Sequence, residues 1–270
     1  MTELKGKIAL VTGGSRGAGR GIALELAKAG AYVYVTGRHD NLNDVVKEME
    51  QSGGAGAALR CDHTEDRETE ETVRRILQEQ GRLDILVNNV WGGNDLKIEN
   101  KPFWELETDH WKNMFDAGVR AQLMTNHFAI PLMRKSPQGG LIVHTTFWDD
   151  DKYIGHFYYD LAKNALVRMA YGLSIELAGD GIAVIPLSPG WMRTELVLES
   201  MNTDEDHWQE VEDLRNSEST AYIGRAVRAM AADPEIMSRT GVPQQVGRLA
   251  ETYGFTDIDG RRVPVFKVPE

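Results

Sequence analysis

The chain has 270 residues, of which 41% are hydrophobic and 26% charged, and this ordinary globular composition excludes a disordered or fibrous protein. Its formal net charge of −11 argues against general binding to nucleic acids or anionic membranes. Cys61 is the only cysteine, which excludes an internal disulfide framework and a cysteine-rich zinc site. Because no window approaches about 18 apolar residues and the N-terminal segment lacks a signal-peptide core, we expect a soluble cytoplasmic protein.

Short β-rich runs alternate along the chain with segments of helical periodicity. Apolar side chains recur at helical spacing after the first run, until Gly30, and again after the second run, until Gly53. Longer helical segments are predicted over residues 111–133 and 159–177. The predicted strands are residues 8–12, 32–36, 57–61, 83–87, 141–145 and 182–187.

The strands are apolar on both faces and are separated by helices, a pattern typical of parallel pairing through right-handed crossovers. We therefore predict an α/β fold in which residues 1–270 form a single-domain, Rossmann-like, doubly wound parallel sheet with helices on both faces. Residues 194–220 would form a substrate lid, and residues 252–270 a C-terminal arm. Such sheets bind ligands beyond the carboxyl ends of their strands, so the residues that follow each strand are the functional candidates.

A glycine-rich loop follows the first predicted strand and leads directly into a helix. Gly13, Gly17 and Gly19 allow a tight turn and bring the backbone close to a pyrophosphate at the positive helix N-terminus, with Ser15 and Arg16 between them. The spacing Gly-x3-Gly-x-Gly differs from the commoner Gly-x-Gly-x2-Gly. Its position between a strand and a helix favours a dinucleotide site over a plain turn.

This loop resembles that of the short-chain dehydrogenase/reductase family, and four further segments resemble the family in the same order, over about residues 5 to 200. These segments are Asp62, Asn88-Asn89-Val90-Trp91-Gly92, the Tyr-x3-Lys of Tyr159 and Lys163, and Pro189-Gly190 with Thr194. The resemblance implies an oxidoreductase with a dinucleotide cofactor. The implied cofactor-binding residues are Gly13, Ser15, Arg16, Gly17, Gly19, Arg38, Asp62, Asn89, Tyr159, Lys163, Pro189, Gly190 and Thr194.

The end of the second strand decides between NAD and NADP. An NAD enzyme needs a carboxylate there to accept hydrogen bonds from the ribose 2′-OH, but this chain has Gly37 followed by Arg38. Arg38 and Arg16 can pair bidentately with a 2′-phosphate, so we expect the cofactor to be NADP(H). The alternatives are that both arginines are merely solvated and that Asp40 folds back and weakens the preference.

Tyr159 and Lys163 are the predicted catalytic pair, because residues i and i+4 share one helix face. Tyr159 would donate a proton to a carbonyl oxygen, and the Lys163 ammonium would lower the pKa of the phenol and hold the nicotinamide ribose. Thr146, thirteen residues before Tyr159, takes the place of the family's serine as carbonyl hydrogen-bond donor. Tyr158 competes with Tyr159, but Ala162 follows it at the lysine's spacing.

Gly118 stands where the family has an asparagine, and no neighbour clearly replaces it, since Asn113 lies about 140° round an α-helix from this position. We expect an altered proton relay, with room for a water beside Gly118. A glycine at this position resembles the pattern of one branch of the family. Two further segments resemble that branch: Thr-Gly-Arg-His after the second strand and Tyr-Gly-x-x-Asp-x-Asp-Gly-Arg near the C-terminus. That branch implies a carbonyl reductase for bulky apolar substrates. The alternative is an NADP(H)-binding sensor or scaffold without catalysis.

Aromatic rings flank the predicted site, which favours an apolar ligand, although some of them are expected to pack in the core. The rings are Trp91, Phe147, Trp148, Tyr153, Phe157, Tyr158 and Trp191. The lid segment carries nine acidic residues against Arg215 alone, and we interpret them as a solvated helix face rather than a site for a cationic substrate.

The remaining partner predictions are a small carbonyl or alcohol substrate, no nucleic acid and no membrane. The tripeptide Asp149-Asp150-Asp151 is interpreted as a hydrated loop, so no metal is predicted. The family resemblance implies a homodimer or homotetramer formed through the two long helices.

Overall fold

The strands form one parallel sheet that runs through the middle of the molecule. The computed structural model describes residues 3–39, 41–96, 99, 101–150 and 152–268. Within these residues the strand order is β3-β2-β1-β4-β5-β6-β7. β1 and β4 are parallel neighbours, and the strands before β4 lie on one side of this boundary while the later strands lie on the other. The strands are β1 (Ile8–Val11), β2 (Tyr32–Gly37), β3 (Ala55–Arg60), β4 (Ile85–Asn88), β5 (Gly140–Thr145), β6 (Ile182–Ser188) and β7 (Gln244–Gln245).

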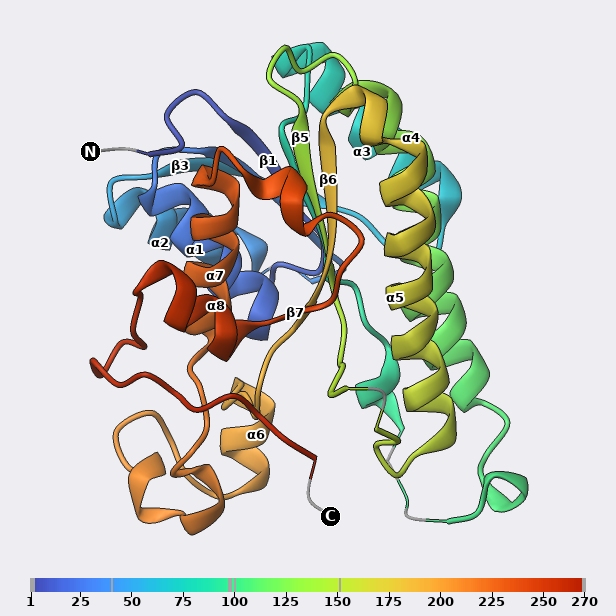
Figure 1. Cartoon of the computed structure of the whole chain (residues 1–270), viewed down its shortest axis with the longest axis vertical. Helices are drawn as coiled ribbons and strands as arrows, with labels where there is room; N and C mark the ends of the chain where they lie inside the picture. Colours follow the sequence, from blue (N-terminus) through green and yellow to red (C-terminus); the bar gives the residue numbers. More distant parts are fainter. Residues whose placement is uncertain (1–2, 40, 97–98, 100, 151, 269–270) are drawn as a thin grey trace.

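Helices cover both faces of the sheet (Figure 1). One face carries α1 (Gly17–Lys28), α2 (Leu42–Gln51), α7 (Thr220–Ala232) and α8 (Val246–Tyr253), and the other carries α3 (Asp66–Gln80), α4 (Ala121–Met133) and α5 (Phe157–Glu176). Alternate strand residues feed two cores: Ala9 and Val11 join the α1 side, whereas Ile8 and Leu10 join the α3 side. The predicted doubly wound α/β fold is confirmed.

The six predicted strands are present within two residues of their predicted bounds, but β7 was not predicted. It consists of two polar residues, Gln244 and Gln245, which pair with Leu187 and Ser188 at the end of β6. Two residues without apolar alternation give no strand pattern, so only the pairing reveals this strand.

Residues 111–133 are helical as predicted, but they do not form one regular α-helix. Residues Lys112–Arg120 form a π-helix (η3), and α4 begins only at Ala121, whose N–H donates to the carbonyl of Asp116 five residues back. In a π-helix, residues five apart lie on nearly the same side, so Asn113 and Gly118 are not 140° apart. The wide turns place Gly118 against the indole of Trp91, where an added Cβ would lie 2.7 Å from the ring.

The glycine-rich loop over residues 13–19, called the phosphate loop below after its predicted ligand, is positioned by a close crossing of α1 and α7. A Cβ at Gly21 would lie 2.0 Å from the carbonyl oxygen of Thr220, and one at Gly224 would lie 2.5 Å from that of Gly21. Only glycine allows backbones to approach this closely. The N-terminal end of α1, where the glycine-rich loop ends, is therefore held firmly against α7.

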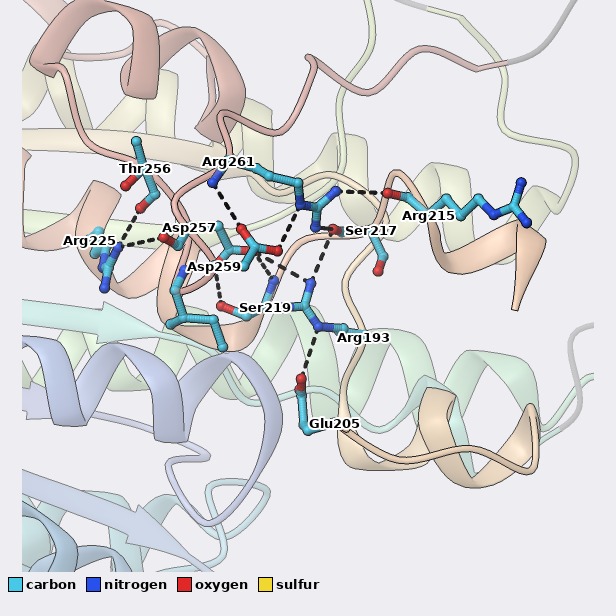
Figure 2. Close-up of polar contacts among 11 residues, drawn as sticks. Arg193, Glu205, Arg215, Ser217, Ser219, Arg225, Thr256, Asp257, Asp259 and Arg261 are labelled. Carbon is cyan, nitrogen blue, oxygen red and sulfur yellow. Dashed lines mark hydrogen bonds and ion pairs between the residues drawn. The ribbon is translucent and has the colours of Figure 1, made fainter. Parts of the chain in front are cut away.

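The segment between β6 and α7 is tied to the C-terminal region by buried ion pairs (Figure 2). Arg193 is 1% exposed; its guanidinium donates to Glu205, to the carbonyl of Ser217 and to the Asp257 carboxylate. Asp257 also accepts from the Ser219 N–H at 2.8 Å, at the start of α7. The chain turns at Asp259-Gly260, and Arg261 beside the turn donates to the carbonyls of Arg215 and Ser217.

None of the helices in the described part of the chain is both long enough and apolar enough to cross a membrane.

Candidate active site

Asn89 joins the glycine-rich loop to the ends of β4 and β5. Its side-chain Nδ2 donates to the carbonyl of Gly13 at 3.1 Å, and its Oδ1 accepts from the Thr145 hydroxyl at 3.2 Å. The backbone N–H of Asn89 donates to the Thr12 hydroxyl at 2.9 Å. A Cβ at Gly19 would lie 2.3 Å from the Gly13 carbonyl oxygen, which explains the glycine there. Three strand ends are thus locked around the predicted cofactor loop.

A lid carboxylate occupies the N-terminus of α1. Glu195 Oε2 accepts from the Gly17 N–H at 2.8 Å, and Thr194 beside it caps α6 (Glu195–Ser200) by accepting from Val197 N. Helix N-termini bind anions, so Glu195 takes a position suited to a phosphate oxygen.

The interpretation of the lid acids as one solvated face is wrong for Glu218, which is 1% exposed. Burial raises the pKa of Glu218 to about 8, and its Oε1 has no hydrogen-bond partner among the described residues. Glu195 and Glu205 are exposed, but each also makes a specific contact, Glu195 with the Gly17 N–H and Glu205 with buried Arg193.

A hollow of about 660 Å³ lies along β3 and α3 and is also lined by Arg38, which follows β2. Its lining brings together three guanidinium groups and four carboxylates: Arg38, Arg60 and Arg75 with Asp62, Glu65, Glu68 and Glu71. Burial opposes ionisation of Asp62, but hydrogen bonds from Thr64 outweigh it and hold the pKa of this carboxyl below its usual range. The predicted cofactor residues Arg38 and Asp62 thus line one hollow of mixed charge.

Gly37 is buried, and a Cβ there would meet Ser15 of the glycine-rich loop at an ordinary contact distance of 3.5 Å. Arg16 is exposed at the N-cap of α1, within the same loop. Asp40, which the sequence offered as a competing carboxylate, lies outside the described residues.

Tyr159 and Lys163 lie together on the first turns of α5, below the end of β5. His156 caps this helix by accepting from the Tyr159 N–H at 3.2 Å. Burial raises the pKa of Tyr159 to about 12 and lowers the pKa of Lys163 to about 7. The Lys163 Nζ lies 3.7 Å from the Trp91 ring centroid and 5.5 Å from that of Tyr159. The lowering of the Tyr159 pKa by Lys163 stays a prediction.

Thr146 lies beside this pair but turns its hydroxyl toward the helix backbone. It is 3% exposed, and its Oγ1 donates to the carbonyl of Lys163 at 2.7 Å. The hydroxyl has a single proton, so it must rotate away from this carbonyl to donate to a substrate oxygen.

The place predicted for a water beside Gly118 is filled by the indole of Trp91. The Lys163 Nζ lies 3.7 Å from the Trp91 ring centroid, and the Tyr159 ring packs edge-on at 5.5 Å. The expectation of a water there is therefore wrong. Sequence analysis missed Trp91 as the side chain that fills this space, because the two positions lie 27 residues apart and no local pattern links them.

The predicted aromatic residues fall into two groups. Phe147 lies beside Tyr159 and also contacts Phe266, a C-terminal residue that sequence analysis missed. Tyr158 and Phe157 instead pack against Phe103 in the loop before η3. Tyr158 therefore belongs to a separate aromatic cluster, in keeping with the prediction that Tyr159 is the tyrosine of the site.

The C-terminal arm contacts the segment that follows β5. The Lys267 ammonium donates to Asp149 at 2.7 Å and to Asp150 at 2.6 Å, and the Val268 N–H donates to Asp149 at 2.7 Å. Asp149 is 1% exposed, so the interpretation of this tripeptide as a hydrated loop is wrong for it, and Asp151 lies outside the described residues. A Cβ at Gly190 would lie 3.4 Å from Phe266, which brings the predicted Pro189-Gly190 segment to the same wall.

The sheet, the glycine-rich loop at its switch point and the Tyr159–Lys163 pair define the class of nicotinamide-dependent oxidoreductases. The sequence profile of the short chain dehydrogenases matches residues 7–205. Dehydrogenase/reductase SDR family member 1 of Mus musculus is 37% identical over 273 residues, which covers 97% of this chain and 87% of the relative. The chain therefore belongs to the short-chain dehydrogenase/reductase family, whose members use NAD(P)(H), and the branch predicted from Gly118 is that of this relative.

Two solved structures support the same assignment. A 7α-hydroxysteroid dehydrogenase complexed with NADH and 7-oxo glycochenodeoxycholic acid has a TM-score of 0.76 and 27% identity, over 90% of this chain and 94% of that one. A short chain dehydrogenase from Burkholderia cenocepacia in complex with NADP has a TM-score of 0.73 and 27% identity, over 90% of this chain and 97% of that one. Similar folds therefore bind either dinucleotide, and the choice rests on particular residues.

Proposed function

We propose that this protein reduces a ketone or aldehyde with hydride from NADPH. The observation that carries the proposal is the buried group of Tyr159, Lys163 and Thr146 at the end of β5, where Thr146 is bonded to the Lys163 backbone. Tyr159 would protonate the carbonyl oxygen, Lys163 would hold the nicotinamide ribose and stabilise the phenolate, and the Thr146 hydroxyl would polarise the carbonyl. The cofactor supplies the hydride when bound.

The preference for NADPH is supported by the end of β2. Gly37 provides no carboxylate for a ribose 2′-OH, and Arg38 lines the hollow beyond it. A guanidinium pairs bidentately with phosphate, so this surface fits a 2′-phosphate better than a free hydroxyl. The phosphate loop residues Gly13, Ser15, Arg16, Gly17 and Gly19 would hold the pyrophosphate, once it displaces the Glu195 carboxylate from the Gly17 N–H.

The proposed substrate is a bulky apolar carbonyl compound, such as a steroid-like or aromatic ketone. Phe147 and Phe266 form one wall next to Tyr159, and Trp191 is 43% exposed after Pro189-Gly190. Apolar walls with a few polar groups at the reacting centre are typical of sites for such ligands. Residues 194–220 would act as the lid and the arm after residue 252 would close the far side.

Oxidation of NADPH, followed at 340 nm against a panel of small, aromatic and steroid-like ketones, tests the proposal. We expect turnover with bulky ketones and a higher kcat/KM with NADPH than with NADH. Tyr159→Phe should abolish turnover while NADPH still binds, since the phenol hydroxyl is the proton donor. A wild-type protein that binds NADPH but turns over no carbonyl would instead support the sensor or scaffold alternative.

We also propose a homodimer or homotetramer built on α4 and α5. Large apolar side chains are exposed on these helices in the single chain: Leu123 (47%), Leu161 (44%), Tyr171 (45%) and Ile175 (62%). Exposed apolar side chains gathered on neighbouring helices mark contact surfaces. Light scattering of the purified protein checks this, and a monomer at micromolar concentration would refute it.

A further inference from the structure

The indole of Trp91 lies in a slot that two glycines create. A Cβ at Gly118 would lie 2.7 Å from ring atoms Cε3 and Cζ3, and a Cβ at Gly93 would lie 2.6 Å from Cε2 and Cζ2. Neither glycine has positive φ, so neither is required by backbone conformation. Both are explained by the ring, which needs the space that a side chain at either position would fill.

The ring contacts both members of the catalytic pair. The Lys163 Nζ lies 3.7 Å above the Trp91 centroid, within the range of a strong cation–π interaction, and Lys163 is 7% exposed. The Tyr159 ring meets the indole at 5.5 Å and 86°, an edge-to-face geometry. In the part of the chain that the structure describes, Lys163 Nζ has no hydrogen-bond acceptor; it faces the rings of Trp91, at 3.7 Å, and of Tyr159, at 5.5 Å.

We propose that Trp91 is a positioning residue of the reaction, whose π face holds the Lys163 ammonium group and whose edge orients the Tyr159 ring. Its ring fills the space that a side chain at position 118 would take. The proposal rests on the proposed function for its effect on turnover, but not for its effect on Lys163.

The physical consequence concerns the protonation of Lys163. Burial lowers the pKa of this group to about 7, and no described charged group shifts it; Tyr159 is the titratable side chain that faces it. The negative face of the indole favours the ammonium over the neutral amine. An indole face cannot pass on a proton as an amide-bound water can, so Trp91 positions the cation without serving as a relay.

Titration of Lys163 by NMR in the full-length protein with ¹³C-labelled lysine tests the contact directly. Lys163→Met assigns the resonance. We expect Trp91→Leu to lower the proton affinity of Lys163 about tenfold, and Trp91→Phe to lower it about threefold, since a smaller ring face remains. Trp104→Leu is the matched control, because Trp104 is 79% exposed and should leave the titration unchanged. An unchanged Lys163 titration in Trp91→Leu would overturn the proposal.

A paired exchange tests the effect on turnover. Gly118→Asn should lower kcat more than 100-fold, because the side chain displaces the indole. The double variant Trp91→Gly, Gly118→Asn gives the amide the space of the indole and should recover kcat to within about tenfold of wild type. Wild-type activity in Gly118→Asn, or a folded double variant no better than the single one, would count against the exchange. If wild type shows no turnover, the proposed function fails and the NMR titration alone decides the role of Trp91.

Discussion

The proposed preference for NADPH over NADH depends on Gly37, which has no side chain. A carboxylate at this position should reverse the preference. A Cβ at Gly37 would lie 3.4 Å from Leu42 and 3.5 Å from Ser15, both ordinary contacts, and Gly37 is not among the glycines with positive φ. Gly37→Asp therefore fits the backbone without strain. Its carboxylate would stand next to Arg38, at the position where NAD enzymes bind the ribose 2′-OH.

The size of the effect follows from electrostatics. A carboxylate about 5 Å from a 2′-phosphate costs about 3 kcal/mol per unit charge at an effective dielectric constant of about 20, or about 100-fold in kcat/KM with NADPH. With NADH the same carboxylate accepts a charge-assisted hydrogen bond from the 2′-OH, worth about 1.5–3 kcal/mol. The NADPH-to-NADH ratio of kcat/KM should therefore fall by about 1,000-fold.

Steady-state kinetics with both cofactors and one good ketone provide the assay. Gly37→Asn is the control, because it adds the same volume without the charge and should change the ratio by less than about tenfold. Thermal unfolding verifies that both variants fold as well as wild type. Equal losses in Gly37→Asp and Gly37→Asn, or an unchanged ratio in Gly37→Asp, would refute the assignment of this position to the 2′-phosphate.

Three further predictions concern the lid and the arm. Glu195→Gln should strengthen NADPH binding several-fold in a fluorescence titration, because the carboxylate that competes for the Gly17 N–H is lost; weaker binding would contradict this. The pKa of Glu218 is raised to about 8. The contribution of its protonated carboxyl to wild-type stability is therefore fully present below about pH 4.5 and is lost as the pH rises through about 8. Glu218→Gln does not titrate and should gain a few kcal/mol relative to wild type between pH 5 and 9, seen as a Tm difference that grows with pH. Lys267→Ala should raise KM for bulky ketones more than for small ones, because Phe266 loses its anchor; equal KM changes would argue against an arm that shapes the pocket.

The fold could be predicted from sequence because its information is local and repeated. Each parallel strand is buried on both faces, so a short apolar run next to a helical period identifies it without knowledge of its partners. The phosphate loop could be predicted for the same reason, since Gly13 and Gly17, both with positive φ, are required by its own backbone. Strands and turns whose conformation depends on their own residues alone could thus be predicted from the sequence.

The features that could not be predicted depend on contacts between distant segments. Arg193 reads as a surface residue in sequence, yet it is buried against Asp257, 64 residues away. Asp149 likewise pairs with Lys267, 118 residues away, and no local pattern distinguishes this carboxylate from a hydrated one. Charged residues carry no periodicity that reports their partners, so their burial shows only in three dimensions.

The C-terminal arm takes part in both of these distant contacts and so connects the predicted lid with the segment after β5. At Asp257 it is bound to the base of the lid through Arg193 and to the start of α7 through Ser219 (Figure 2). About ten residues later it is bound to Asp149, which follows β5 near Thr146 and Phe147. The family's motifs end near residue 200, so they specify the chemistry of this site but not the segment that joins its two walls. Substrate choice in this chain should therefore depend on residues 257–268 at least as strongly as on the motif residues.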